Sequence, residues 1–151
     1  TVSTGEMYGF ADVKFAQVTN GDLTTGTNED LILSPNGTGN IGIGTTSPAA
    51  KLTVSGHIHT TGTAPTLASC GTSPTIAGND VVGKVTVGTG SSEASCTVTF
   101  NSAWTNAPSC VANNETQMLV TRAVTTTTTM ILSAEMTFDA DVISYRCLGY
   151  E

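Results

Sequence analysis

Alternating glycine is the feature that most limits how this chain can fold. From Asn40 to Pro48 the sequence reads Asn-Ile-Gly-Ile-Gly-Thr-Thr-Ser-Pro, and a second short strand pattern follows in residues 51–54. Glycine inside a strand loses conformational entropy on folding and has no side chain to pack, so isolated domains rarely use it this way. Alternate glycines suit places where backbones crowd together. We therefore expect several chains to wind about one axis here.

The two halves of the chain differ in their pattern. In residues 1–64 short apolar couplets, such as Ile41 with Ile43, are followed by turn signals of Gly, Asn and Pro. Strands this short cannot form a core alone, which favours neighbours along the chain or from identical chains. Residues 65–151 show period-2 alternation between polar turns, which predicts a compact antiparallel β-sandwich. The expected fold is therefore all-β, with an intertwined shaft or neck (residues 1–64) before a sandwich tip (residues 65–151).

The alternation in the second half also predicts which side chains share a strand face. Inward faces are expected from these sets: Val85 and Val87; Cys96, Val98 and Phe100; Met130, Leu132, Ala134, Met136 and Phe138; Ile143, Tyr145 and Cys147.

Composition restricts the partners that the chain can have. Five Lys and Arg face twelve Asp and Glu, for a net charge of −7. Nucleic acids and anionic membranes are bound by clustered basic side chains, so neither is expected as a partner. No apolar run reaches the length of a membrane span, and no membrane insertion is expected. The chain opens at Thr1, and we expect it to be a piece of a longer protein.

The four cysteines predict two disulfides and an oxidising, extracellular setting. They form no CxxC pair, the spacing typical of structural zinc sites, so no structural zinc site is expected. Cys96 and Cys147 lie on apolar strand faces, and Cys110 follows a Pro-Ser turn. Among the connectivities open to four cysteines we expect Cys70–Cys96 and Cys110–Cys147; the alternative is buried reduced thiols.

Residues 30–56 carry a resemblance to a known family. Their run of Gly-Asn-Ile-Gly-Ile-Gly-Thr-Thr-Ser-Pro, followed by Lys-Leu-Thr-Val-Ser-Gly, resembles a signature of tail-fibre and receptor-binding proteins of bacteriophages and of related bacterial surface proteins. The second half also resembles a tip module of that family, in residues 70–74, 78–80, 96–100 and 104–110. The resemblance implies an intertwined homotrimer in the virion tail fibre, outside the cell, whose distal part binds a glycan or protein on the host surface.

His57 and His59 are the sharpest local signal for a metal. Both imidazoles share one face if the segment is a strand, and three chains on a threefold axis would present enough nitrogens for octahedral coordination. The resemblance implies the same, because such fibres hold iron with rings of this kind. The site would take iron or another transition metal. The alternative is a pair of exposed or stacked histidines, since an unbroken strand from Leu52 puts them opposite the apolar residues unless Gly56 forms a bulge.

Trp104 marks a candidate receptor-binding site. It lies in a predicted loop with Asn101 and Asn106 nearby, and aromatic rings beside amides are a common way to bind sugars. The alternative is a tryptophan of the sandwich core, because Trp is often partly buried.

The acidic residues Glu135, Asp139 and Asp141 surround Phe138. Paired carboxylates could serve a glycosidase, or Asp139 and Asp141 could bind Ca²⁺. We favour solvated acids at a turn. Serine-hydrolase, P-loop and dinucleotide-binding patterns are missing from the sequence, and no enzyme activity is expected.

These observations favour a structural and adhesive virion protein, the distal part of a trimeric tail fibre that binds a host receptor. The first alternative is a bacterial surface adhesin or lectin-like module of the same architecture. The second is a polysaccharide-degrading tailspike, which would need a wide acidic groove and more aromatic side chains than the chain's 5%.

Overall fold

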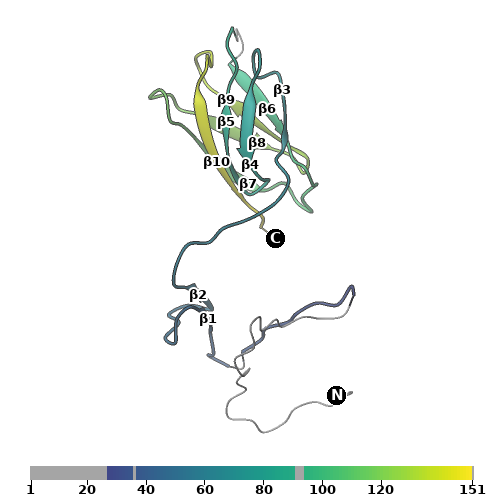
Figure 1. The fold of residues 1–151 in the computed structure, drawn as a ribbon, viewed down its shortest axis with the longest axis vertical. Coiled ribbons are helices and arrows are strands. Elements are labelled where there is room, and N and C mark those ends of the chain that lie inside the picture. The colour runs from purple at the N-terminus through teal and green to yellow at the C-terminus, as the bar shows by residue number, and fades with distance from the viewer. Residues whose placement is uncertain (1–26, 36, 91–93, 151) are drawn as a thin grey trace, which may run out of the picture. The chain divides into compact units, whose positions relative to one another are not determined.

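The structure is a computed structural model that describes residues 27–35, 37–90 and 94–150. As expected, these residues are all-β, with ten strands and no helix (Figure 1). The described residues thus include no helix that could span a membrane. The chain divides into two compact units, Thr1–His57 and Ile58–Glu151, which we call the N-terminal unit and the sandwich unit. Of the shaft expected over residues 1–64, residues 1–26 lie outside the described part.

The predicted boundary after residue 64 falls inside the sandwich unit. The reason is a hydrogen-bonded anchor: Asn79 Nδ2 donates to the Thr60 carbonyl oxygen at 2.8 Å, and the Asn79 side chain is buried. Asn79 Oδ1 in turn accepts the backbone N–H groups of Val81 and Val82, which holds its side chain in one orientation. The segment around Thr60 is therefore fixed to the sandwich before its first strand begins.

The N-terminal unit is built around one parallel strand pair. β1 (Ile41–Ile43) pairs with β2 (Leu52–Val54), and residues 44–51 return the chain between them. Parallel strands usually need a crossover of a dozen or more residues; here three-residue strands shorten the return path. Lys51 Nζ donates to the carbonyl oxygens of Gly37 and Gly39 at 3.1 and 3.0 Å, and Asn40 Nδ2 donates to that of Pro48 at 3.1 Å. Two side chains of the motif thus close the turn.

The alternate glycines have reasons within one chain. A Cβ on Gly42 would lie 2.5 Å from the Thr45 carbonyl oxygen, closer than atoms can approach. Gly44 has a φ of +71°, a left-handed conformation that side chains other than glycine rarely adopt. The expectation that alternation reflects crowding between chains is therefore not needed to explain these positions. Local turn geometry accounts for both.

The N-terminal unit does not bury a core within one chain. None of its described side chains, in residues 27–35 and 37–57, is buried. Large apolar side chains are instead half or more exposed, from 50% to 78%: Leu31, Ile32, Leu33, Ile43 and Leu52. A two-stranded sheet is at best marginally stable in water without packing on one face. This unit gains little hydrophobic stabilisation from the described part of a single chain.

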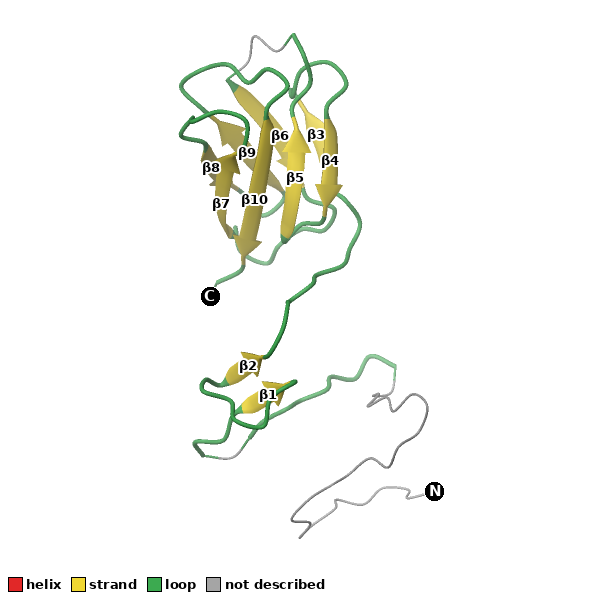
Figure 2. Cartoon of the chain, turned by 60° about the vertical axis from the view of Figure 1, so that its left-hand side comes forward, coloured by secondary structure: helices red, strands yellow, loops and turns green. Residues whose placement is uncertain are grey.

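The sandwich unit consists of two four-stranded antiparallel sheets packed face to face (Figure 2). One sheet has the order β4-β5-β10-β7 and the other the order β3-β6-β9-β8. The strands are β3 (Thr66–Ala68), β4 (Thr75–Gly78), β5 (Val82–Thr86), β6 (Ser95–Thr99), β7 (Ser109–Asn114), β8 (Arg122–Thr125), β9 (Thr129–Ser133) and β10 (Val142–Leu148).

The core lies between the sheets and follows the period-2 pattern. Val85, Val98, Leu132 and Ile143 are all fully buried, each from a different strand. The expectation fails after β9, which ends at Ser133. Met136 is 61% exposed, so the predicted alternation does not continue to it. Phe138 is nevertheless fully buried, reaching the core from a loop and not from a strand.

Both disulfides have the expected pairing. Cys70, two residues after the end of β3, is bonded to Cys96 in β6. Cys110–Cys147 joins directly opposed residues of β7 and β10. The described residues contain no free cysteine. Each sheet of the sandwich thus has one disulfide, which links two of its neighbouring strands: β3 and β6 in one sheet, and β7 and β10 in the other.

Candidate functional site

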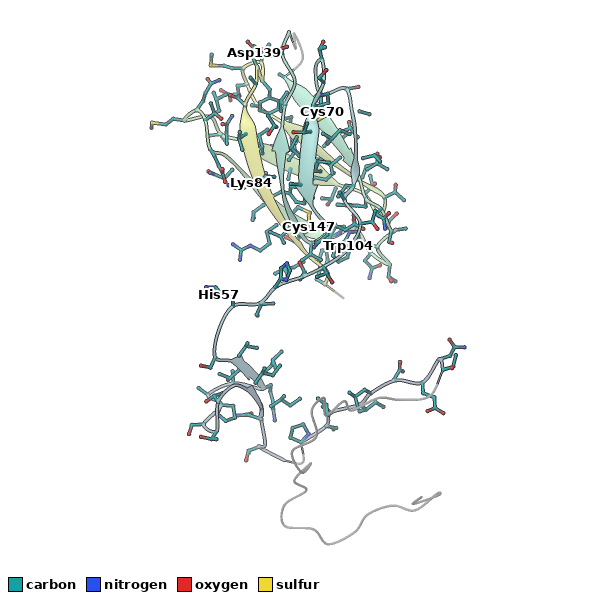
Figure 3. The ribbon with its side chains drawn as sticks, in the orientation of Figure 1. His57, Cys70, Lys84, Trp104, Asp139 and Cys147 are labelled. Carbon is teal, nitrogen blue, oxygen red and sulfur yellow. A yellow bond between two sulfur atoms is a disulfide. The ribbon has the colours of Figure 1, made fainter. Side chains whose placement is uncertain are left out.

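A shallow pocket lies beside Trp104 at one end of the sandwich, near Cys147 (Figure 3). Its volume is about 370 Å³, and its walls come from two segments far apart in sequence. Residues 104–106 form one wall, and Gly149 and Tyr150, just after β10, form the other. The pocket therefore exists only because β10 brings the end of the chain back to this loop.

Trp104 combines the two roles that its sequence left open. It is partly buried and packs on the core, where its ring meets that of Phe100 edge to face at 6.1 Å between centroids and 73° between planes. Its backbone N–H donates to the Thr127 carbonyl oxygen at 2.8 Å, which holds the loop to the start of β9. The remaining ring surface lines the pocket. Trp104 is thus both a packing residue and a wall of the site.

The indole N–H of Trp104 does not take part in the pocket. Nε1 is buried and has no hydrogen-bond partner among the described residues. An unpaired buried donor of this kind costs about 1–3 kcal/mol. Any ligand here would meet the ring surface of Trp104 and not its N–H group.

Tyr150 completes the site and was not expected from the sequence. Its side chain is 63% exposed and lines the pocket with Trp104, and Asn106 supplies an amide group. Gly149 lies beside the indole: a Cβ added there would be 3.4 Å from the Trp104 ring, an ordinary van der Waals distance. Only the pairing of β10 with β5 and β7 places Tyr150 here, so no local pattern could have indicated it.

Asn101 does not belong to this pocket. Its backbone N–H and that of Ser102 donate to the two carboxylate oxygens of Asp80, at 2.8 and 2.9 Å. Its side chain donates to the Ser102 hydroxyl at 3.3 Å. Of the residues expected for receptor binding, Trp104 and Asn106 are brought together, and Asn101 instead helps fasten its loop to Asp80.

His57 and His59 are both exposed, and neither lies in a strand. The metal prediction requires both imidazoles to lie on one face of a strand, and these two residues do not form a strand. The division between the two units also runs between His57 and Ile58. No cluster of three or more His, Cys, Asp or Glu among the described residues could hold a metal ion. Two imidazoles per chain are too few ligands alone, so a metal at these residues stays a prediction that depends on further chains.

Of the three acids near Phe138, Glu135 and Asp139 are exposed as expected, whereas the expectation of a solvated acid is wrong for Asp141. Asp141 is fully buried, and its carboxylate accepts the side-chain amides of Asn114 and Gln117 at 3.0 and 2.8 Å. Asp139 is exposed and accepts the Gly90 backbone N–H at 3.1 Å. Asp141 serves to fasten the loop after β7 to the start of β10. This arrangement gives no support to the open carboxylate pair of a glycosidase.

Comparisons of this chain with models of known protein families, with curated proteins and with solved structures give no match.

Proposed function

We propose that this chain is the distal part of a bacteriophage tail fibre, a structural and adhesive virion protein that acts as a trimer and binds a receptor on the host surface. One observation carries the proposal more than any other. The segment with the tail-fibre signature, residues 30–56, buries no described side chain within one chain, while the disulfide-bonded sandwich that follows buries twelve hydrophobic ones.

The exposed apolar side chains of the N-terminal unit support the trimer. Ile32 is 78% exposed, and Ile43 and Leu52 are more than half exposed. Full burial of a fully exposed Ile or Leu side chain is worth about 1.5–3 kcal/mol, so each of these partly exposed side chains would gain roughly one half to three quarters of that from strands of identical chains. The two disulfides support an oxidising location such as the outside of a virion.

The pocket of Trp104, Asn106 and Tyr150 supports receptor binding by the sandwich unit. Two aromatic side chains and an amide suit a sugar ring, whose C–H face stacks on aromatic carbon while its hydroxyls bond to the amide. Each such site would bind weakly, and three copies in one fibre would raise the avidity without any new contact.

The test uses the intrinsic fluorescence of Trp104, the single tryptophan of the chain. Polysaccharides purified from bacterial surfaces would be screened on an array, and each hit titrated into the whole protein. We expect the ligand to change Trp104 emission and Tyr150→Ala to weaken binding about tenfold, which corresponds to 1.4 kcal/mol of stacking. The matched control is Val124→Ala, since Val124 is exposed on the outer face of the β3-β6-β9-β8 sheet and does not line the pocket. Binding that leaves the emission and the Tyr150→Ala affinity unchanged would place the receptor site elsewhere.

A further inference from the structure

The two outer faces of the sandwich differ in chemistry. The face of the β3-β6-β9-β8 sheet is dominated by hydroxyl groups. Among its described residues, Ile131 and Val124 are the only exposed large apolar side chains. The residues that carry the hydroxyl groups are Thr66, Ser95, Thr97, Thr99, Thr129 and Ser133. The face of the β4-β5-β10-β7 sheet exposes Val82, Val111 and Leu148, at 44%, 65% and 63%, among polar side chains that include Lys84, Asn113 and Arg146. A sheet face that exposes several large apolar groups suits a protein contact.

A groove runs over this apolar face. It has a volume of about 590 Å³ and crosses β5, β10 and β7. Ile58, which is 78% exposed, lines it together with Val82, Val111 and Leu148. All of these side chains belong to the sandwich unit.

Arg146 lies in the middle of the groove. In the strand register it is directly opposed by Val82 on one side and Val111 on the other. Its guanidinium has no ion pair or hydrogen bond with any described residue, whereas Lys84 on the same face pairs with Glu115 at 2.7 Å. Arg146 is exposed in a single chain. An occupant that covers the groove must therefore bring a carboxylate or other anion as well as apolar surface.

The chemistry of the groove favours a protein as that occupant. Sugars stack on exposed aromatic rings, and the only aromatic side chain in the lining, Tyr145, is 3% exposed. Nucleic acid would need clustered cations, and among the lining residues Arg146 is alone. This chain itself carries twelve acidic residues and a net charge of −7, so a second copy can supply a carboxylate for Arg146. The exposed apolar side chains of the same face can supply the apolar surface.

We propose that this groove is the face by which neighbouring copies contact one another, with Arg146 paired to a carboxylate of the adjacent copy. The inference rests on the proposed trimer and names the surface that the sandwich contributes to it. The chain enters the sandwich at this face, because Ile58 and Thr60 line the groove and Asn79 fixes Thr60 there. In chains that are joined through their N-terminal units, the segment that leads into each sandwich unit would therefore lie along this groove.

The test compares two arginines of the whole protein. Phenylglyoxal labels exposed guanidinium groups, and mass spectrometry of peptides gives the labelling rates of Arg146 and of Arg122, which is exposed on the other outer face. In the oligomer we expect Arg146 to react about tenfold more slowly than Arg122, the ratio that 1.4 kcal/mol of contact gives. Val111→Asn, which breaks the apolar contact without adding a charge beside Arg146, should bring the two rates together, and Val124→Asn, the matched change on the other face, should not.

Four results separate the proposals. A protein with the mass of three chains and a protected Arg146 supports both. A protein of that mass in which both arginines react alike keeps the trimer and overturns the contact face. A monomer in which both react alike overturns the trimer and the contact face together. A monomer with a protected Arg146 shows that another part of this chain covers the groove, and it too overturns both. Both substituted valines are exposed in the single chain, and near-UV circular dichroism would verify that the variants fold.

Discussion

The N-terminal unit and the sandwich unit use apolar side chains in opposite ways. The sandwich buries Phe138, Met130 and Leu132 completely within one chain. The N-terminal unit leaves Leu31, Ile32 and Leu33 half or more exposed, and none of its described side chains is buried. Burial of apolar surface is the main favourable contribution to folding. The sandwich unit gains this contribution within its own chain, and the described part of the N-terminal unit does not.

Core truncation should show the largest difference between the units. Phe138→Ala removes a fully buried ring and should lower the free energy of unfolding of the sandwich by about 3–5 kcal/mol. Ile43→Ala, at a side chain that is 56% exposed, should leave the sandwich transition unchanged and weaken only the association of chains. Urea unfolding followed by Trp104 fluorescence measures the first effect, and sedimentation velocity measures the second. Equal losses of sandwich stability from the two changes would remove the distinction.

Disulfide removal should have the next largest effect and should also be confined to the sandwich. Replacing both Cys110 and Cys147 by Ala should lower its free energy of unfolding by about 2–4 kcal/mol, since the bridge closes a loop of 37 residues in the unfolded chain. Thermal unfolding of wild type and variant in the same buffer gives the difference. The mass of the native assembly should stay the same. If the double variant lost its assembly while the sandwich remained folded, the two units would not be independent.

High pH should produce a smaller effect that is also specific to the sandwich. Burial, together with the negative charge of Asp80, raises the pKa of Tyr145 to about 12. The neutral phenol donates to the Asn79 carbonyl oxygen at 2.7 Å, so its stabilisation is complete below pH 10 and is lost as the pH rises toward 12. Tyr145→Phe should cost about 1 kcal/mol at neutral pH and should flatten the decline above pH 10.

Urea unfolding at several pH values from 7 to about 12 measures this profile. Tyr150→Phe, at an exposed side chain, is the control and should keep the wild-type decline. A Tyr145→Phe profile as steep as that of wild type would show that another group causes the loss of stability.

Sequence pattern predicted the sandwich well because its strands bury one face each. Val85, Cys96, Leu132 and Ile143 alternate with exposed or half-exposed neighbours. The expected disulfide pairing, one of the connectivities open to four cysteines, is also confirmed. The prediction failed at Met136, where β9 had already ended at Ser133. An apolar residue in a loop and one in a strand look alike in sequence, and only the packed core distinguishes them.

The candidate site was half predictable. Trp104 and Asn106 lie two residues apart in the sequence, so their side-chain types could indicate a sugar site. Tyr150 is brought to them by the antiparallel pairing of the last strand, which no local pattern records. The glycine pattern could not decide between two causes. Gly42 is required by its close approach to Thr45, three residues away, and a close approach between chains would select glycine in the same way.

The dependence of the N-terminal unit on other copies is tested most directly by sedimentation equilibrium of the whole protein in native buffer. We expect a mass near three times 15.4 kDa, about 46 kDa, together with slow amide exchange at Ile41 and Ser55, whose N–H groups donate between β1 and β2. A mass of 15.4 kDa with those same amides still protected would contradict it, because the N-terminal unit would then be stable within a single chain.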